Sequence, residues 1–341
     1  MSLEFYAEPH PSAELISRVA ALAPVNPFYS LPYVKCRQDS GSATWVLMLR
    51  GDSRIVSACT AFLRSGRLNK SLEIHSLPVL PAGDAFWTGL LQFCTEQRIS
   101  SLEVNSAASA QAEIPVLPGE IWRKRRNEHV IFLDGADLWK NLRKDHITNI
   151  RRAHRAGLKL HRSRDTEACI EHCKVISASI ERRRARGESI AEDTDPSRYM
   201  LFLENGAGLL FQAVAGGKVM SSDLILLAAK GGYGHSIGTN AEGMRCGASH
   251  FLEYEIAAAL QAEGMEVFNL GGTDQSNPGL ENFKAGFGAG RIELESAQFY
   301  LGTKLQSTLT AALAMLRKVG SLRFGSREFA AHHGKRGSRR R

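Results

Sequence analysis

The chain has 341 residues, of which 43% are hydrophobic and 23% are charged, and its formal net charge is +8. This is the composition of an ordinary globular protein, which excludes extensive disorder and fibrous repeats. The length predicts two domains. No apolar run approaches the roughly 20 residues of a membrane-spanning helix. The first residues carry two glutamates and no apolar core, so we expect no secretory signal and a cytoplasmic protein.

Basic residues are concentrated in three segments. Residues 123–126 read Arg-Lys-Arg-Arg, residues 140–164 hold nine Lys and Arg against the single acid Asp145, and the last seven positions hold five. Such clusters suit phosphate-bearing partners, which include nucleic acid, nucleotide-linked sugars and coenzyme A. They are equally compatible with solvated helix faces.

The six cysteines include no C-x-x-C pair, which indicates free thiols in a reducing compartment. Cys169, His172 and Cys173 lie close together in a helical pattern, but a zinc site would need further ligands from elsewhere in the chain. Buried thiols on a helix explain this spacing better, so we expect no metal.

The first half of the chain alternates strands with one helix. The pattern predicts strands at 44–50, 54–63, 70–77, 101–104 and 129–133 and a helix at 82–98. Gly51-Asp52-Ser53 between the first two strands is a hairpin signal. Asp134-Gly135 ends the pattern, and we place a domain boundary there.

The second half repeats this order with stronger signals. The pattern predicts helical stretches at 138–153, 166–186 and 248–263 and strands at 158–161, 208–215, 218–229, 233–239, 265–270 and 291–298. Both halves run hairpin, third strand, helix, strand. We therefore predict an α+β fold of two tandem domains, 1–134 and 135–300, each with a mixed, mostly antiparallel sheet flanked by helices. Residues 301–341 follow as a helix, at 301–319, and a basic tail, at 332–341.

The segment 240–247, which joins a predicted strand to a helix, is a candidate anion site. It contains Gly243, Arg245 and Gly247, and the helix opens at Ala248. Backbone N–H groups at a helix start bind anions such as a pyrophosphate. We therefore predict a cofactor-binding role for these four residues, with a plain strand-to-helix turn as the alternative.

A second glycine-bearing region surrounds a lone lysine. Asn269, Gly271 and Gly272 end a predicted strand, and Phe283-Lys284 precedes Gly-Phe-Gly at 286–288. A lysine among phenylalanines and glycines is partly desolvated, which strengthens its electrostatics. Lys284 can then stabilise an oxyanion or hold a phosphate, and we expect folding to survive Lys284→Ala. The alternative is a surface lysine beside a packed phenylalanine pair.

Asp223 and His235 lie on adjacent predicted strands and can reach one cleft. Either can act as a general base that removes a proton from an amine, and either can be purely structural. The spacing offers no nucleophile elbow, so we expect no Ser-His-Asp or Cys-His mechanism.

Two strings resemble signatures of the Fem-type (FemAB-like) transferases of the GNAT N-acyltransferase superfamily. The first, at 141–153, reads Asn-Leu-Arg-Lys-Asp-His-Ile-Thr-Asn-Ile-Arg-Arg-Ala and is followed by Gly157-Leu158. The second joins 268–272 to the lysine segment at 283–288. The resemblance covers about 138–300 and implies two tandem GNAT-like domains. It places Lys284 at the lysine position of the signature, so Lys284 joins His235 and Asp223 as a catalytic candidate. The segments that carry the resemblance include Arg151, Arg152, Asn269, Gly271, Gly272 and Phe283, and we expect these to bind substrate.

The resemblance also implies a reaction. It predicts an N-acyltransferase that joins an acyl group to an amine of a cell-envelope or polysaccharide precursor, without a permanently bound cofactor. A BioF2-like branch is assigned to acyl-CoA, whereas another branch takes an aminoacyl group from aminoacyl-tRNA. The chain has no room for the long helical arm of some aminoacyl transferases, and 245–248 match a coenzyme A loop only loosely, so both donors stay open. A non-catalytic nucleic-acid-binding relative is a third interpretation.

Overall fold

The structure is a computed structural model that describes residues 3–52, 54–66, 69–79, 83–110, 113–188, 194–273 and 277–302. The predicted helix and basic tail beyond residue 302 lie outside the described residues.

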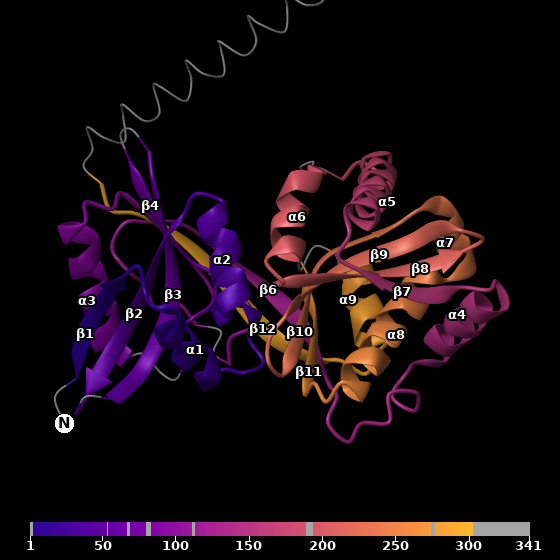
Figure 1. The fold of residues 1–341 in the computed structure, drawn as a ribbon, viewed down its shortest axis with the longest axis horizontal. Helices are drawn as coiled ribbons and strands as arrows, with labels where there is room; N and C mark the ends of the chain where they lie inside the picture. The colour runs from indigo at the N-terminus through magenta and orange to yellow at the C-terminus, as the bar shows by residue number, and fades with distance from the viewer. Residues whose placement is uncertain are drawn as a thin grey trace, which may run out of the picture.

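The described strands form one 12-stranded sheet in the order β1-β2-β3-β4-β5-β12-β6-β11-β10-β9-β8-β7 (Figure 1). Their bounds are β1 (Glu4–Pro9), β2 (Ala43–Gly51), β3 (Arg54–Ser65), β4 (Lys70–Ile74), β5 (Ser101–Asn105), β6 (Glu120–Phe132), β7 (Lys159–Ser163), β8 (Gly208–Ala215), β9 (Lys218–Leu227), β10 (Gly231–Thr239), β11 (Val267–Thr273) and β12 (Gly290–Tyr300). Only two neighbouring pairs are parallel among these strands, β4 with β5 and β10 with β11. The predicted α+β class with a mostly antiparallel sheet is confirmed.

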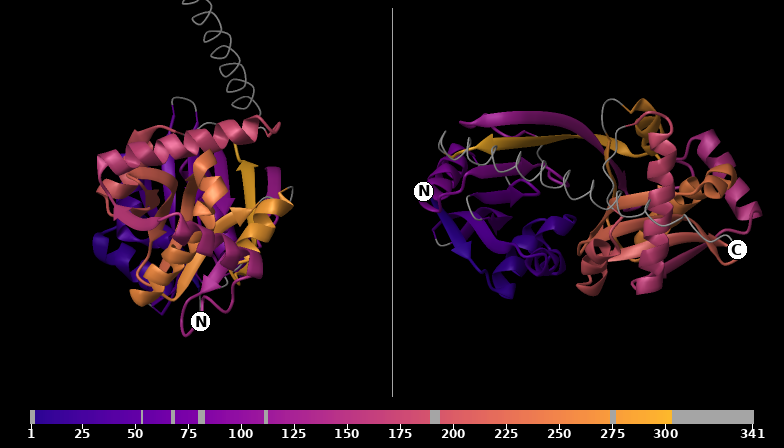
Figure 2. Two further views of the ribbon diagram at one scale, coloured as in Figure 1. Left: turned by 90° about the vertical axis from the view of Figure 1, so that its right-hand side faces the viewer. Right: turned by 90° about the horizontal axis from the view of Figure 1, so that it is seen from above.

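The two ends of the sheet share one order of connections. Antiparallel β1 to β4 lead through a helix into β5, and antiparallel β7 to β10 lead through helices into β11. The last strand of each set then crosses over, because β6 pairs with β11 and β12 pairs with β5. The long strands β6 and β12 also pair with each other and run side by side between the two ends (Figure 2, right). We call β1–β5 with β12 the N-terminal half, and β7–β11 with β6 the C-terminal half. The domain limits 1–134 and 135–300 stay a prediction.

Helices pack on the sheet through alternating strand residues. The helices are α1 (Ala13–Leu22), the 3-10 helix η1 (Pro27–Tyr29), α2 (Leu31–Asp39), α3 (Gly83–Glu96), α4 (Lys144–Arg155), α5 (Thr166–Arg184), α6 (Pro196–Glu204), α7 (Ala241–Cys246), α8 (Ala248–Ala262) and α9 (Pro278–Ala285). In β8, Leu209 and Phe211 pack with Phe251 of α8, whereas Leu210 packs with Cys169 of α5. Successive strand residues point to opposite faces, so α5 and α8 cover opposite faces of the C-terminal half.

The two halves touch through a shared apolar cluster. Phe28 of η1 and Tyr33 of α2 pack with Leu226 of β9 and Tyr233 of β10. At Gly231 a Cβ atom would lie 2.4 Å from the carbonyl oxygen of Val25. Only a glycine permits this approach, and the approach brings η1 and α2 against the start of β10.

Several elements differ from the sequence predictions. The elements β1, α1, α2 and α6 were not predicted, and the strand predicted at 129–133 is the end of the longer β6. Two segments that read as loops are helical: α7 lies within 240–247, and α9 carries Lys284. Pro278 begins α9, and the side chain of Asn277 caps it by accepting a hydrogen bond from the N–H of Leu280. An Asn followed by Pro is a start signal typical of helices. The glycines that follow this segment favoured a loop in the sequence prediction.

Candidate active site

A cavity of about 440 Å³ lies between the two halves. Its lining from the N-terminal half consists of Phe28, Tyr33, His75, Asn105 and Ala107. The rest comes from β6, β9, β10, β11 and α9, as Arg126, Asp223, Tyr233, Gly234, His235, Ser236, Ile237, Leu270, Gly271, Gly272, Leu280 and Lys284. Five residues from the predicted site, Asp223, His235, Gly271, Gly272 and Lys284, therefore meet here.

Both parallel strand pairs stop at this cavity. The last pair between β4 and β5 joins Ile74 to Val104, and the next residues, His75 and Asn105, line the cavity. The last pair between β10 and β11 is Tyr233 with Asn269, and Gly234 and Leu270 follow as lining residues. The cavity thus occupies the open ends of two parallel pairs, one from each half.

The strands of the C-terminal half are irregular at this point. The pairing of β10 with β9 shifts register between Gly234 and Ser236, so His235 is the extra residue of a bulge. The pairing of β11 with β6 shifts between Asn269 and Gly272. Bulges interrupt the ladder and re-aim side chains, and they are common beside active sites. Exposed His235 stands at the rim, with its ring 4.9 Å from that of Phe202.

Lys284 is buried, with 6% of its surface exposed. Its Nζ atom donates hydrogen bonds to the carbonyl oxygens of Gly271, at 2.9 Å, and Gly272, at 3.1 Å. Gly271 has a φ of +77°, and a Cβ atom there would lie 2.7 Å from the carbonyl oxygen of Gly234. A glycine is therefore required where β11 turns its carbonyl groups toward the lysine. Burial lowers the pKa of Lys284, and the charge of Glu253 opposes this shift.

Two buried carboxyl groups share the electrostatic environment of Lys284. Asp223 of β9 and Glu253 of α8 are each 2% exposed, and Asp223 lines the cavity. Oδ1 of Asp223 and Oε2 of Glu253 have no hydrogen-bond partner among the described residues. Burial raises the pKa of both groups, that of Glu253 to about 7, and the charge of Lys284 lowers them. Because two neighbouring carboxylates disfavour joint ionisation, the pair retains a proton near neutral pH.

Asn269 and Phe283 have structural contacts. The Asn269 side chain donates to Oε2 of Glu128 and accepts from the N–H of Gly271, both at 2.8 Å, which shapes the end of β11. Phe283 packs against the rings of His250, at 4.9 Å, and Phe287, at 5.2 Å. Neither side chain lines the cavity, so their predicted substrate contacts stay predictions.

The remaining predicted residues lie together at a second place, the junction of α4 with α7 and α8. Nη1 of Arg152 lies 3.5 Å from the carbonyl oxygen of Arg245. A Cβ atom at Gly247 would lie 2.6 Å from the carbonyl oxygen of Asn149. The residues here are Arg152, Gly243, Arg245, Gly247 and Ala248, which we call the α7–α8 turn group. Arg151 precedes Arg152 on α4, and its guanidinium lies 5.8 Å from the centroid of the Trp139 ring. This group lies where β10 ends and α8 begins. The cavity and the α7–α8 turn group therefore flank the same strand.

Several buried polar residues of the site were not predicted. Glu128 of β6 is 2% exposed and accepts hydrogen bonds from Tyr233, Asn269 and the N–H of Ala108. Glu253 sits in an apolar helical pattern, where a single acid carries no signal. Their partners lie far away in the sequence, so spacing alone does not reveal them.

Residues 140–285 match the family described as the acetyltransferase (GNAT) domain. This segment is a GNAT acetyltransferase domain. It carries Asp223, Glu253 and Lys284, and the chain is an acyltransferase.

Solved structures share the fold over most of the chain. FemX superimposes with a TM-score of 0.62 at 12% identity, over 86% of this chain and 97% of that one. A tandem GNAT protein from the clavulanic acid biosynthesis pathway gives 0.53 at 12% identity, over 89% and 100%. L-PGS from Bacillus licheniformis gives 0.53 at 11% identity, over 89% and 96%. No curated protein sequence matches significantly. The likenesses establish a GNAT fold in tandem arrangement.

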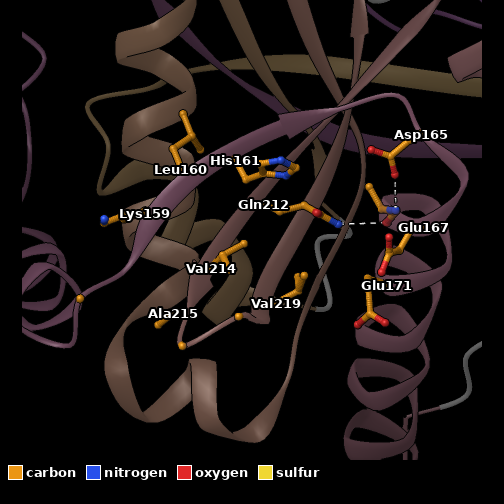
Figure 3. A pocket seen from close by; sticks show the side chains of 14 residues that line it. Lys159, Leu160, His161, Asp165, Glu167, Glu171, Gln212, Val214, Ala215 and Val219 are labelled. Atoms are coloured by element: carbon orange, nitrogen blue, oxygen red, sulfur yellow. Dashed lines mark hydrogen bonds between the residues drawn. The ribbon is translucent and has the colours of Figure 1, made fainter.

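A larger cavity, of about 630 Å³, lies at the outer edge of the GNAT domain, between β7, β8 and the start of α5 (Figure 3). The side chains of Asp165, Glu167 and Glu171 lie on its α5 side. Gln212 turns toward α5 and donates to the carbonyl oxygen of Ala168 at 3.0 Å. None of the predicted site residues lines this cavity, so the cavity between the halves is the better candidate.

Two further observations concern metals and membranes. His172 of the GNAT domain is buried, and its ring nitrogens lie 2.9 Å from the hydroxyl oxygens of Ser222 and Ser236. Burial lowers its pKa to about 3, so the ring is neutral. Within the described part of the chain, no three His, Cys, Asp or Glu side chains gather as a metal site.

None of the described helices combines the length and apolar character of a membrane span.

Proposed function

We propose that this GNAT-type enzyme transfers an acyl group from acyl-CoA to an amine within the cavity between its halves. The observation that carries the proposal is that a buried ammonium, Lys284, and a buried carboxyl group, Asp223, line one cavity at the open end of β10 and β11. Attack on a thioester develops negative charge on the carbonyl oxygen. A preorganised positive charge in a site of low dielectric constant stabilises that charge strongly.

The reaction uses these groups in two steps. The nitrogen of a neutral amine attacks the thioester carbon and gives up one proton to a base in the cavity, and the oxyanion faces Nζ of Lys284. The carbon–sulfur bond then breaks, and the sulfur leaves with the electron pair. Asp223, which stays protonated because it is buried beside Glu253, gives its proton to the sulfur. The proposed role of Asp223 is thus that of an acid rather than of the base that the sequence suggests.

The α7–α8 turn group supports a place for the phosphates of coenzyme A. The first turn of α8 presents backbone N–H groups at the end of β10, and helix N-termini attract anions. Arg152 and Arg245 supply positive charge beside this turn. A donor held there extends along β10 toward Lys284.

The acceptor that we propose is an amine of a cell-envelope or polysaccharide precursor. Such precursors often carry phosphate or carboxylate groups, and Arg126 lines the cavity. Its Nη2 donates to Ser296 at 3.0 Å, whereas its Nε has no partner among the described residues. A planar guanidinium at the wall of a cavity suits an anionic group.

Aminoacyl-tRNA is the second candidate donor. The basic side chains of α4 favour it, because Lys144, Arg151, Arg152 and Arg155 are exposed on one helix. Phosphate contacts of this kind weaken steeply with salt. For a protein with many phosphate contacts, the affinity falls by about 10³–10⁵ between 50 and 200 mM salt. A loss of affinity of this size for charged tRNA would support aminoacyl-tRNA as the donor.

The test is a panel of acyl-CoA thioesters and aminoacyl-tRNAs, each first examined for thermal protection. A ligand at 100 times its dissociation constant adds about 2.7 kcal/mol of stability. Donors that protect are then mixed with amine acceptors, and the acylated product is sought by mass spectrometry. Protection and product with acyl-CoA support the proposal. If product forms with aminoacyl-tRNA and not with acyl-CoA, aminoacyl-tRNA is the donor.

A further inference from the structure

We propose that Tyr33, on the N-terminal half, is a catalytic residue that takes the proton of the acceptor amine and passes its own proton to His75, which Glu73 holds in place. The inference rests on the proposed acyl transfer. It supplies the base of that reaction from outside the GNAT domain.

Tyr33, His75 and Glu73 form a continuous chain of hydrogen bonds. The hydroxyl oxygen of Tyr33 lies 2.8 Å from Nδ1 of His75, and Nε2 of His75 lies 3.2 Å from Oε2 of Glu73. Tyr33 is 5% exposed, and the side chains of His75 and Glu73 are 18% and 21% exposed. Tyr33 and His75 line the same cavity as Lys284. The relay and the lysine therefore face one substrate space from the two halves.

The charges around Glu73 set the direction of each hydrogen bond. The hydrogen bond from His75 lowers the pKa of Glu73, and the charges of Arg37, 2.5 Å away, and Arg64, 3.9 Å away, add to this effect. An ionised carboxylate only accepts, so Nε2 of His75 carries the proton and donates. Nδ1 then accepts, and Tyr33 donates. Burial lowers the pKa of His75, so the ring is neutral at rest, whereas its hydrogen bond to Glu73 raises that pKa and favours the protonated ring.

Aromatic packing holds the Tyr33 ring in one orientation. Its centroid lies 5.2 Å from that of Phe28, 6.0 Å from Phe62 and 6.2 Å from Phe202 of α6. Among the described residues no N–H or O–H group donates to the Tyr33 oxygen. Its lone pairs are thus available to the N–H of an amine in the cavity.

The proton steps balance with those at Asp223. As the nitrogen–carbon bond forms, the amine proton moves to the Tyr33 oxygen, and the Tyr33 proton moves to Nδ1 of His75. The resulting imidazolium is paired with Glu73. The leaving sulfur takes the proton of Asp223. Between turnovers His75 releases its proton to solvent, and Asp223 takes one up, so no further reactant is needed.

A chemical probe tests the relay without any acyl donor. A small aryl sulfonyl fluoride reacts with a tyrosine whose proton a neighbouring base can take: the oxygen–sulfur bond forms, fluoride leaves with its electron pair, and the proton goes to His75. Labelling of Tyr33 is followed by peptide mass spectrometry in the wild type and in His75→Gln, which keeps a hydrogen-bond acceptor but not the base. We expect labelling to slow on the order of 10²-fold in the variant, the lower end of what a positioned base contributes. Equal rates would overturn the relay.

Turnover supplies the second test, with a matched tyrosine as control. Tyr33→Phe keeps the packed ring and removes the hydroxyl, and we expect kcat to fall on the order of 10²-fold with KM little changed. His75→Gln should lower kcat similarly, and the double variant should lose little more, because the two residues act as a unit. Tyr29→Phe removes a buried hydroxyl that donates to the carbonyl oxygen of Leu77 outside the cavity, so it should lower the melting temperature but keep kcat.

The outcomes separate the two proposals. Wild-type transfer with a Tyr33→Phe kcat within threefold overturns the relay and leaves acyl transfer standing. A wild type that transfers from neither acyl-CoA nor aminoacyl-tRNA overturns the proposed function. The sulfonyl fluoride rates then decide the relay on their own.

Discussion

The Nζ atom of Lys284 lies 2.9 Å from the carbonyl oxygen of Gly271, and this hydrogen bond ties α9 to the free end of β11. The bond fixes a positive charge inside the cavity between the halves, where Asp223 also lies. It makes Lys284 part of the fold as well as of the proposed chemistry.

Replacing Lys284 should therefore lower stability as well as activity. Lys284→Ala removes the charge that favours ionised Glu253 and the donor to the carbonyl oxygens of Gly271 and Gly272, and the loss of one partner of a buried charge interaction costs about 3 kcal/mol. This revises the expectation from the sequence that folding tolerates the change. Lys284→Gln can still donate to Gly271 and should lose less. Urea unfolding of both variants measures the difference, and an unchanged midpoint in Lys284→Ala would contradict the burial of the charge.

Glu253 should make stability depend on pH. Its pKa is raised to about 7 in the folded chain, so between its ordinary value and pH 7 the folded state binds the additional proton. The contribution of Glu253 to the free energy of unfolding is therefore full below about pH 4.5. It falls by on the order of 1–3 kcal/mol as the pH rises to 7. Glu253→Gln should flatten urea midpoints between pH 5 and 8. The exposed Glu242→Gln is the control, and an equal slope in wild type and Glu253→Gln would refute the assignment.

Gly271 and Gly264 allow backbone strain to be separated from a clash. Both have positive φ, +77° and +74°, but a Cβ atom at Gly264 meets nothing within 4 Å, whereas one at Gly271 meets the carbonyl oxygen of Gly234. Gly264→Ala should cost about 1–2 kcal/mol from conformation alone. Gly271→Ala should cost clearly more, and it should also reduce turnover. Thermal unfolding of the two variants is the comparison, and equal losses would show that the clash relaxes freely.

Asp223→Asn should slow the departure of the leaving group. We expect kcat with an acyl-CoA to fall on the order of 10²-fold, as is usual for the loss of a positioned acid. A donor with a nitro-substituted thiophenol needs no proton to leave, so the variant should recover most of its rate with it. If the defect is the same for both donors, Asp223 is not the acid.

The sequence predicts part of this site, and particular residues show why. Asp223 and His235 lie on neighbouring strands of a meander whose turns are visible as glycine pairs, so their proximity follows from the pattern. Lys284 is marked by its flanking phenylalanines and glycines, but its burial depends on the turned carbonyl groups of β11. The tandem repeat in the order of elements is also readable.

The contribution of the N-terminal half is not readable from the sequence. Tyr33 lies on an unpredicted helix, and its partner His75 is 42 positions away. The two join the cavity because β6 and β12 exchange halves and bring the open ends of both parallel pairs together. Strand exchange depends on pairing over long sequence distances, which no local pattern encodes.

The measurement that tests the central claim most directly is turnover of Lys284→Ala beside Lys230→Ala. Lys230 also approaches a carbonyl oxygen, that of Gly264 at 3.4 Å, but it is half exposed and lies outside the cavity. With the acyl donor and amine that the wild type uses, we predict a fall on the order of 10²–10³ in kcat for Lys284→Ala and almost none for Lys230→Ala. A Lys284→Ala rate within about threefold of wild type, a barrier change below about 1 kcal/mol, would contradict a catalytic site in the cavity between the halves.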